Sequence, residues 1–238
     1  MIDPKLLDAA REGDRRALAR AITSIEASPD GDQIERDPSV PIVGITGPPG
    51  VGKSTLANAM ITSLRSNSRR VGVVAVDPSS PITGGALLGD RIRMQDHIGD
   101  EGVFVRSMAT RGRLGGLSPA TRRAVSLMTV SAFDIVLVET VGVGQSEVEV
   151  MNVADLVVLV VAPGWGDQIQ ADKAGIVEIA DLFVINKADR EDVASLRRAL
   201  QEIAGTPARQ RPVVETIATT GEGVEGLLAT IDSLVADR

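Results

Sequence analysis

Residues 47–54 read Gly-Pro-Pro-Gly-Val-Gly-Lys-Ser, an uninterrupted match to the pattern GxxxxGK(S/T). The segment follows an apolar run at 42–46 and precedes a segment with helical periodicity. In this context the glycines let backbone N–H groups face phosphate oxygens, Lys53 neutralises the β- and γ-phosphates, and the Ser54 hydroxyl ligates Mg²⁺. We therefore predict a phosphate-binding loop whose nucleotide contacts come from Gly47, Pro48, Pro49, Gly50, Val51, Gly52, Lys53, Ser54 and Thr55.

From residue 41 onward, short Val/Ile-rich runs alternate with helical segments. Continuous apolar runs suit strands that are buried on both faces, so the pattern predicts an α/β fold with a doubly wound, mostly parallel sheet. The expected strands are 42–46, 71–76, 103–107, 135–139, 156–161, 182–185 and 212–216. The expected helices are 54–67, 119–131, 169–179, 190–204 and 223–236.

The residues before this domain have a different composition. An apolar stripe predicts one helix over 4–26, and a segment rich in Pro, Gly and Asp at 27–40 predicts a linker. We therefore expect an N-terminal helical extension over 1–40 and a nucleotide-binding domain over 41–238.

Composition narrows the class of protein. The net charge of −7 argues against a general nucleic-acid-binding surface. The absence of Cys excludes disulfides and thiolate chemistry and fits a reducing compartment. The N-terminus lacks a signal-peptide pattern, and the longest apolar runs are too short to span a bilayer. We expect a soluble cytoplasmic protein that binds neither nucleic acid nor a membrane.

A second motif, Asn186-Lys187-Ala188-Asp189, follows the expected strand 182–185 and matches the pattern NKxD of guanine-binding proteins. The Asp189 carboxylate can accept from guanine N1–H and N2–H₂, a donor pair that adenine lacks. Asn186 would read the acceptor side of the base or brace the loop, and Lys187 would lay its stem along the ring. The Ala218 backbone is either a contact to guanine O6 or part of a plain loop.

Three carboxylates are candidates for holding Mg²⁺ together with Ser54. Asp77 and Glu139 end expected strands, at the sheet edge where ligands bind in open α/β folds. Asp90 lies in a Gly-rich stretch, and both it and Asp77 could instead be turn carboxylates or helix caps. Glu139 occupies the strand-end position, called Walker B, at which proteins with this phosphate-loop motif usually carry Asp. Gly142, three residues further on, can donate its N–H to the γ-phosphate.

Two further features allow two interpretations each. Trp165 is either part of the core or a contact for a partner. The basic residues Arg111, Arg113, Arg122 and Arg123 form either a solvated face or a surface for an acidic partner or an acyl-CoA phosphate.

Taken together, the segments GITGPPGVGKST, VDPSSP, GGALLGDRIRM, LVETVGVGQSE, GDQIQADKAGIVEIAD and NKAD resemble the MeaB/ArgK family of P-loop GTPases. The resemblance implies a P-loop NTPase of the SIMIBI class. It also implies a G-protein chaperone that hydrolyses GTP to gate cofactor loading and protection of an adenosylcobalamin-dependent acyl-CoA mutase, such as methylmalonyl-CoA mutase. A GTP-dependent metallochaperone and a small-molecule kinase are the alternative functions.

The resemblance also assigns roles to individual residues. Lys53, Arg93 and Glu139 would act in hydrolysis, with Arg93 stabilising charge in the transition state or remaining a solvated helix residue. The family's third switch would include Asp167, Gln170 and Lys173. Family members are typically longer at both ends and dimerise through a C-terminal arm. The resemblance implies a homodimer, but this sequence ends at Arg238, soon after its last expected helix, so the usual contact through that arm is not expected here.

Overall fold

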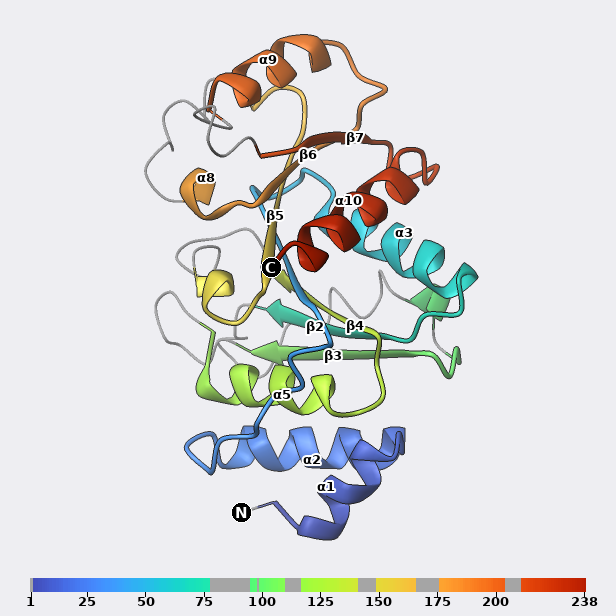
Figure 1. Cartoon of the computed structure of the whole chain (residues 1–238), viewed down its shortest axis with the longest axis vertical. Coiled ribbons are helices and arrows are strands. Elements are labelled where there is room, and N and C mark those ends of the chain that lie inside the picture. The colour runs from blue at the N-terminus through green and yellow to red at the C-terminus, as the bar shows by residue number, and fades with distance from the viewer. Residues whose placement is uncertain are drawn as a thin grey trace.

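The described part of the chain forms one seven-stranded sheet with helices on both faces (Figure 1). The structure, a computed structural model, describes residues 2–77, 95–97, 99–109, 117–140, 149–165, 176–203 and 211–238. Every pairing between the named strands is parallel, and their order is β3-β2-β4-β1-β5-β6-β7. The strands are β1 Ile42–Thr46, β2 Val71–Asp77, β3 Val103–Ala109, β4 Ile135–Thr140, β5 Leu156–Val161, β6 Leu182–Asn186 and β7 Val213–Thr216. The predicted doubly wound α/β fold is confirmed.

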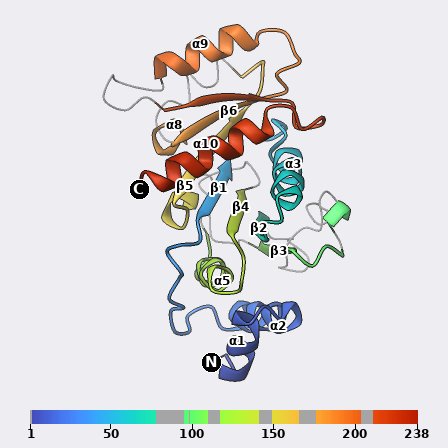
Figure 2. The same ribbon diagram turned by 45° about the vertical axis from the view of Figure 1, so that its right-hand side comes forward.

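The helices cover the sheet in three groups, each with its own hydrophobic cluster. On one face α3 and α10 pack over the central strands. On the other face α5 packs on the sheet, α2 packs on α5 and α1 lies outermost, as Figures 1 and 2 show. A third cluster joins β5 and β6 to α8 and α9. These helices are α3 Lys53–Ser66, α5 Pro119–Thr129, α8 Ile176–Ile179, α9 Val193–Ile203 and α10 Val224–Ala236, with short 3₁₀ turns η1 Gln95–His97 and η2 Val150–Asn152.

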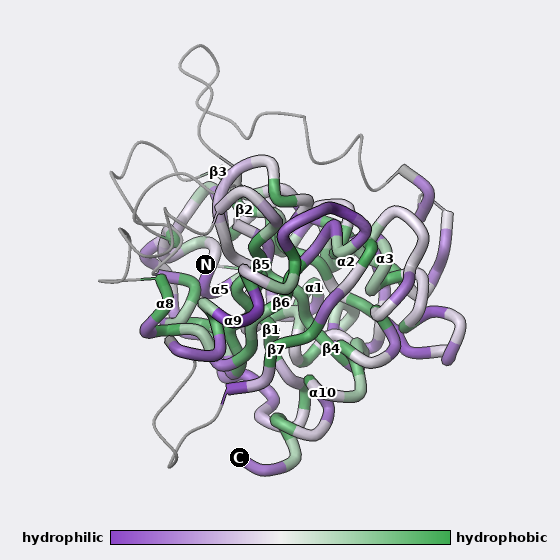
Figure 3. Tube along the Cα trace, turned by 90° about the horizontal axis from the view of Figure 1, so that it is seen from above, coloured by the Kyte–Doolittle hydropathy of each residue, from purple (hydrophilic) through white to green (hydrophobic). Residues whose placement is uncertain are grey.

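The four central strands are buried at every position, which explains their unbroken apolar sequence. All residues of β1, β4, β5 and β6 are buried. Figure 3 shows the same distribution, with hydrophobic segments gathered in the middle of the molecule and hydrophilic ones toward its rim. Burying both faces of a parallel sheet in this way leaves its carboxyl edge as the place for polar chemistry.

The N-terminal extension differs from its prediction, because the single helix expected over 4–26 is two helices, α1 Pro4–Arg11 and α2 Arg15–Ala27. Gly13 adopts a positive φ of 92°, which ends the first helix. Asp14 then caps the second helix by accepting from the Arg16 and Ala17 N–H groups at 2.8 and 3.0 Å. The apolar stripe continues across the break, so periodicity alone did not reveal it.

Aspartates placed just before three strands fix the register of the sheet at its amino edge. The Asp134, Asp155 and Asp181 N–H groups donate to the carbonyls of Arg70, Ile42 and Val157. The same three carboxylates accept from the N–H groups of those residues at 2.5, 2.9 and 2.8 Å. Each aspartate therefore closes a two-bond ring with the neighbouring strand, which a one-residue slip would break.

We expect Asp155→Ala to lower the free energy of unfolding by about 1.5–3 kcal/mol, because a buried strand N–H loses a charged acceptor. Asp155 also pairs with Arg36 at 2.7 Å, so the tie between the linker and the sheet is lost as well. Urea unfolding measures the change. The control is Asp8→Ala, since Asp8 is 69% exposed and its carboxylate pairs, within the described part of the chain, with Arg11 alone at 3.6 Å. Equal unfolding midpoints for the two variants would contradict this role.

Candidate nucleotide-binding site

The phosphate loop joins the carboxyl end of the central strand β1 to the start of α3, and its shape requires glycine at two points. Gly47 has a φ of 139°, and a Cβ there would overlap the Val160 carbonyl oxygen of β5. Gly52 has a φ of 95°, and a Cβ there would crowd the Asn186 amide. The loop is thus pressed against two neighbouring segments, which sets how its N–H groups face the space above the sheet.

Lys53 and Ser54 begin α3 and are both buried. The Lys53 ammonium donates to the carbonyl oxygens of Gly47 and Pro48 at 2.6 and 2.8 Å, so the side chain folds back over the loop. The Lys53 ammonium therefore lies close to the N-terminus of α3, which carries the positive end of the helix dipole. This is the charge arrangement that an anionic phosphate requires.

Glu139 reaches the phosphate loop from β4. Its register partner in β1 is Ile45, two residues before the loop begins. The Ser54 hydroxyl donates to Glu139 Oε1 at 2.5 Å, and both residues are buried. The structure therefore brings together two of the four residues predicted to hold a metal ion.

The remaining predicted residues of this region are placed in part or not at all. Asp77 ends β2, two positions beyond the residue that is paired with Glu139, so its backbone lies at the same carboxyl edge; its side chain lies outside the described residues. Asp90, Arg93 and Gly142 lie outside the described residues altogether, as do Asp167, Gln170 and Lys173.

Asn186 ties three segments together at the other end of the site. Its Nδ2 donates to the Val51 carbonyl of the phosphate loop at 2.9 Å. Its Oδ1 accepts from the Thr216 hydroxyl at 3.2 Å and from the Ala218 N–H at 3.1 Å. Of the two roles considered for Asn186, the structure shows the bracing one.

Lys187 and Asp189 follow Asn186 in the same loop. Lys187 adopts a positive φ of 59°, and its ammonium donates to the Gly50 carbonyl at 2.7 Å. A second contact therefore holds the 186–189 loop against the phosphate loop. The Asp189 side chain is exposed, which leaves its carboxylate accessible to a ligand.

Thr216 is a residue of this site that the sequence reasoning missed. It ends β7, is buried, and its hydroxyl orients the Asn186 amide so that Nδ2 faces Val51. The available signal was its position at the carboxyl end of a strand, two residues before Ala218.

We expect Thr216→Val to weaken GDP binding about five- to tenfold, on the order of 1 kcal/mol, because a buried amide oxygen loses a donor. Fluorescence titration with labelled GDP measures the change. The matched control is Thr230→Val in α10, where the hydroxyl donates within its own helix, to the Gly226 carbonyl at 2.8 Å. Unchanged affinity in Thr216→Val would show that Asn186 is oriented without it.

A cleft of about 740 Å³ opens beside these loops, between α3 and the start of α10. Its walls include Thr55 and Asn58 of α3 and the segment that begins at Ala218 and Thr219. Thr55 and Ala218, both predicted to contact nucleotide, therefore face one hollow. The hollow is large enough for a nucleoside.

Two features with alternative interpretations are resolved in the described part of the chain. Trp165 packs against the first and third hydrophobic clusters, which favours its role in the core. Arg123 was wrongly expected on a solvated face: it is buried and donates to the carbonyls of Ser28 and Asp32 at 2.7 and 3.0 Å. Arg122 stays partly exposed and pairs with Glu149 at 3.8 Å. Arg111 and Arg113 lie outside the described residues.

Among the residues that the structure describes, no helix is long and apolar enough to cross a membrane. Within the same ranges, no cluster of three or more His, Cys, Asp or Glu residues is arranged to hold a metal ion.

A parallel sheet with a phosphate loop after its central strand and an Asn-Lys-x-Asp loop braced against it defines the class of P-loop GTPases. The model of one family in this class, described as "Methylmalonyl Co-A mutase-associated GTPase MeaB", matches residues 18–236. The chain belongs to this MeaB family and is a GTPase.

Similar proteins support the assignment of the chain to this family of GTPases. A Pyrococcus horikoshii protein named as a GTPase is 50% identical over 240 residues, which cover 94% of this chain and 74% of that protein. GTPase ArgK of Escherichia coli is 42% identical over 192 residues, covering 76% and 58%. The mouse methylmalonic aciduria type A homolog, a mitochondrial protein, is 37% identical over 248 residues, covering 92% and 60%.

Solved structures show the same fold. A protein described as a LAO/AO transport system kinase aligns with a TM-score of 0.70 and 27% identity, covering 98% of this chain and 76% of that one. HypB from Helicobacter pylori, solved with nickel, aligns with a TM-score of 0.64 over 92% and 94% of the two chains. Its identity of 15% shows a shared fold alone.

Proposed function

We propose that GTP and Mg²⁺ bind at the carboxyl end of β1, with the phosphates in the 47–55 loop and the guanine in the cleft beside Ala218. The observation that carries this proposal is the approach of Ser54 and Glu139, a hydroxyl and a carboxylate within 2.5 Å at the start of the helix. Oxygen donors of this kind suit Mg²⁺. Asp77 and Asp90 are proposed to complete the ligand set, directly or through water.

The metal ion would neutralise charge on the phosphates. The protein's own part in hydrolysis is positioning and charge stabilisation. Lys53 is proposed to leave the two carbonyls that it now contacts and pair with the β- and γ-phosphates. Arg93 is proposed to stabilise the charge that develops in the transition state. The Gly142 N–H is proposed to donate to the γ-phosphate. We expect slow turnover in the isolated protein and faster turnover with a partner.

Base selection is proposed to rest on Asp189, whose carboxylate would accept from guanine N1–H and N2–H₂. Asn186 and Lys187 support this role, because both are fixed by contacts with the phosphate loop. The distance between the base-reading and phosphate-holding parts of the site is thereby set before nucleotide binds.

We propose an adenosylcobalamin-dependent acyl-CoA mutase as the partner, with GTP binding and hydrolysis gating cofactor loading and protection of that enzyme. Support comes from the name of the family, which describes a GTPase associated with methylmalonyl-CoA mutase, and from the match to the methylmalonic aciduria type A homolog. We also place the protein in the cytoplasm as a homodimer; the lack of Cys fits a reducing compartment.

The test is capture of purified adenosylcobalamin-dependent mutases by the immobilised protein, with GDP in one arm and a non-hydrolysable GTP analogue in the other. We expect one mutase to bind and its retention to differ between the two nucleotides. Capture of no mutase in either arm would leave a GTPase with another partner. Light scattering of the same preparation reports whether it is a dimer.

A further inference from the structure

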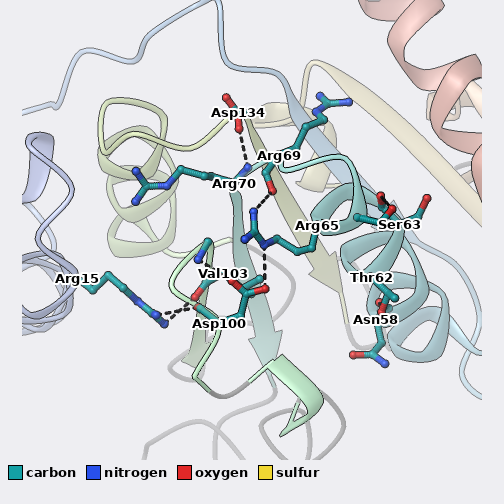
Figure 4. A network of polar contacts seen from close by, with 12 residues as sticks. Arg15, Asn58, Thr62, Ser63, Arg65, Arg69, Arg70, Asp100, Val103 and Asp134 are labelled. Atoms are coloured by element: carbon teal, nitrogen blue, oxygen red, sulfur yellow. Dashed lines mark hydrogen bonds and ion pairs between the residues drawn. The ribbon is translucent and has the colours of Figure 1, made fainter.

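One aspartate, Asp100, is contacted by two helices that lie far apart in the sequence. Arg65, in the last turn of α3, donates its Nε to Asp100 Oδ2 at 2.9 Å. Arg15, the first residue of α2, donates to the Asp100 and Val103 carbonyls at 2.8 and 2.6 Å. Figure 4 shows both guanidinium groups converging on the turn before β3. This turn therefore joins the N-terminal extension to the helix that begins in the phosphate loop.

The turn is built around Arg65, which distinguishes it from an ordinary surface ion pair. Arg65 Nη1 also donates to the Arg69 carbonyl at 2.8 Å. A Cβ at Gly102 would overlap the Arg65 guanidinium, so the Arg65 side chain would have to move to admit any other residue. The Gly102 N–H donates to Asp100 Oδ1 at 2.8 Å. Arg65, and then this N–H, hold the pKa of the Asp100 carboxyl below its usual value.

The path from the turn to the nucleotide site is a single helix. α3 runs from Lys53 to Ser66, and residues along its inner face are fully buried against the sheet. Close-packed helices shift as units and do not deform continuously. A second, longer contact, from Asn58 Nδ2 to Asp96 Oδ2 at 3.4 Å, links the same helix to η1. α3 therefore connects the phosphate loop to the segment that Arg15 holds.

At its other end, α2 is fixed to the same edge strand. Arg106 of β3 pairs with Glu26 and donates to the Thr23 hydroxyl at 3.2 Å. With Arg15 bound at the start of β3, α2 is tied to this strand at both of its ends. β3 lies at the edge of the sheet, where fewer neighbours hold it in place.

We propose that the N-terminal helix pair braces the nucleotide site through the chain of contacts Arg15–Asp100–Arg65, so that docking of α2 and binding of nucleotide stabilise each other. Such coupling is reciprocal. Loosening α2 speeds the release of nucleotide, and bound nucleotide protects α2 and the turn at 99–103 from opening. The coupling concerns the isolated protein and does not depend on a mutase.

Arg15→Ala tests the coupling, with Arg16→Ala as the matched control, because Arg16 is exposed and makes no side-chain bond among the described residues. The readouts are the release rate of fluorescent GDP and the hydrogen exchange of α2 and residues 99–103, with and without GDP. We expect GDP release three- to tenfold faster in Arg15→Ala, with GDP no longer protecting α2. In Arg16→Ala both readouts match the original protein.

Arg15→Lys keeps the charge but loses the planar fork that reaches two carbonyls. If Arg15→Ala does not fold, Arg15→Lys replaces it as the test of the coupling. We expect Arg15→Lys to release GDP faster than the original protein. GDP release at the original rate from a folded variant whose 99–103 turn exchanges faster would overturn the proposal. So would GDP-dependent protection of α2 that survives the loss of Arg15.

Discussion

Asp189→Asn is expected to reverse the base preference of the site from guanine to xanthine nucleotides. Xanthine carries a carbonyl where guanine carries the N2 amino group, and the Asn amide can donate to that oxygen. Sites that select by paired hydrogen bonds discriminate by about 10⁴-fold. We therefore expect GDP affinity to fall by on the order of 10³-fold or more while XDP affinity rises, as measured by competition against labelled nucleotide.

The structure indicates that Asp189→Asn changes the proposed contact with the base without disturbing the rest of the loop. Asp189 is exposed, and the neighbouring Asn186 and Lys187 keep their contacts with the phosphate loop in the variant. Glu191→Gln, an exposed carboxylate two residues further on, is the control and should leave both affinities unchanged. Full retention of GDP preference in Asp189→Asn would remove the proposed contact with the base.

Lys53→Met is expected to lower GTP hydrolysis by on the order of 10²- to 10³-fold, the usual loss when one donor to a transition-state oxyanion is removed. Met keeps the long apolar stem in the buried position but lacks the ammonium. The carbonyls of Gly47 and Pro48 lose a donor as well, so a lower melting temperature is expected. Phosphate release under single-turnover conditions measures the rate.

Lys5→Met, in the exposed first turn of α1, separates this effect from a general loss of positive charge. Hydrolysis by that variant should equal the original rate. If Lys53→Met hydrolysed GTP within threefold of the original protein, another cation would have to supply the charge.

Local patterns predicted most of the fold, because each depends on neighbours in the chain. The strands were placed within one or two residues, since a strand buried on both faces must be apolar throughout. The phosphate loop was also readable, because its turns need glycine at fixed positions. The break at Gly13 was not, because the stripes of α1 and α2 continue one another.

The sequence alone was enough to predict the class of the protein and the order of its strands, and to propose the residues that face phosphate and base. Only the tertiary structure shows which residues from distant parts of the chain contact one another. Asn186 meets Val51 from 135 positions away, and Arg15 meets Asp100 from 85 positions away. Sheet order and helix packing create such contacts between distant segments, and no local pattern of charge or hydropathy encodes them.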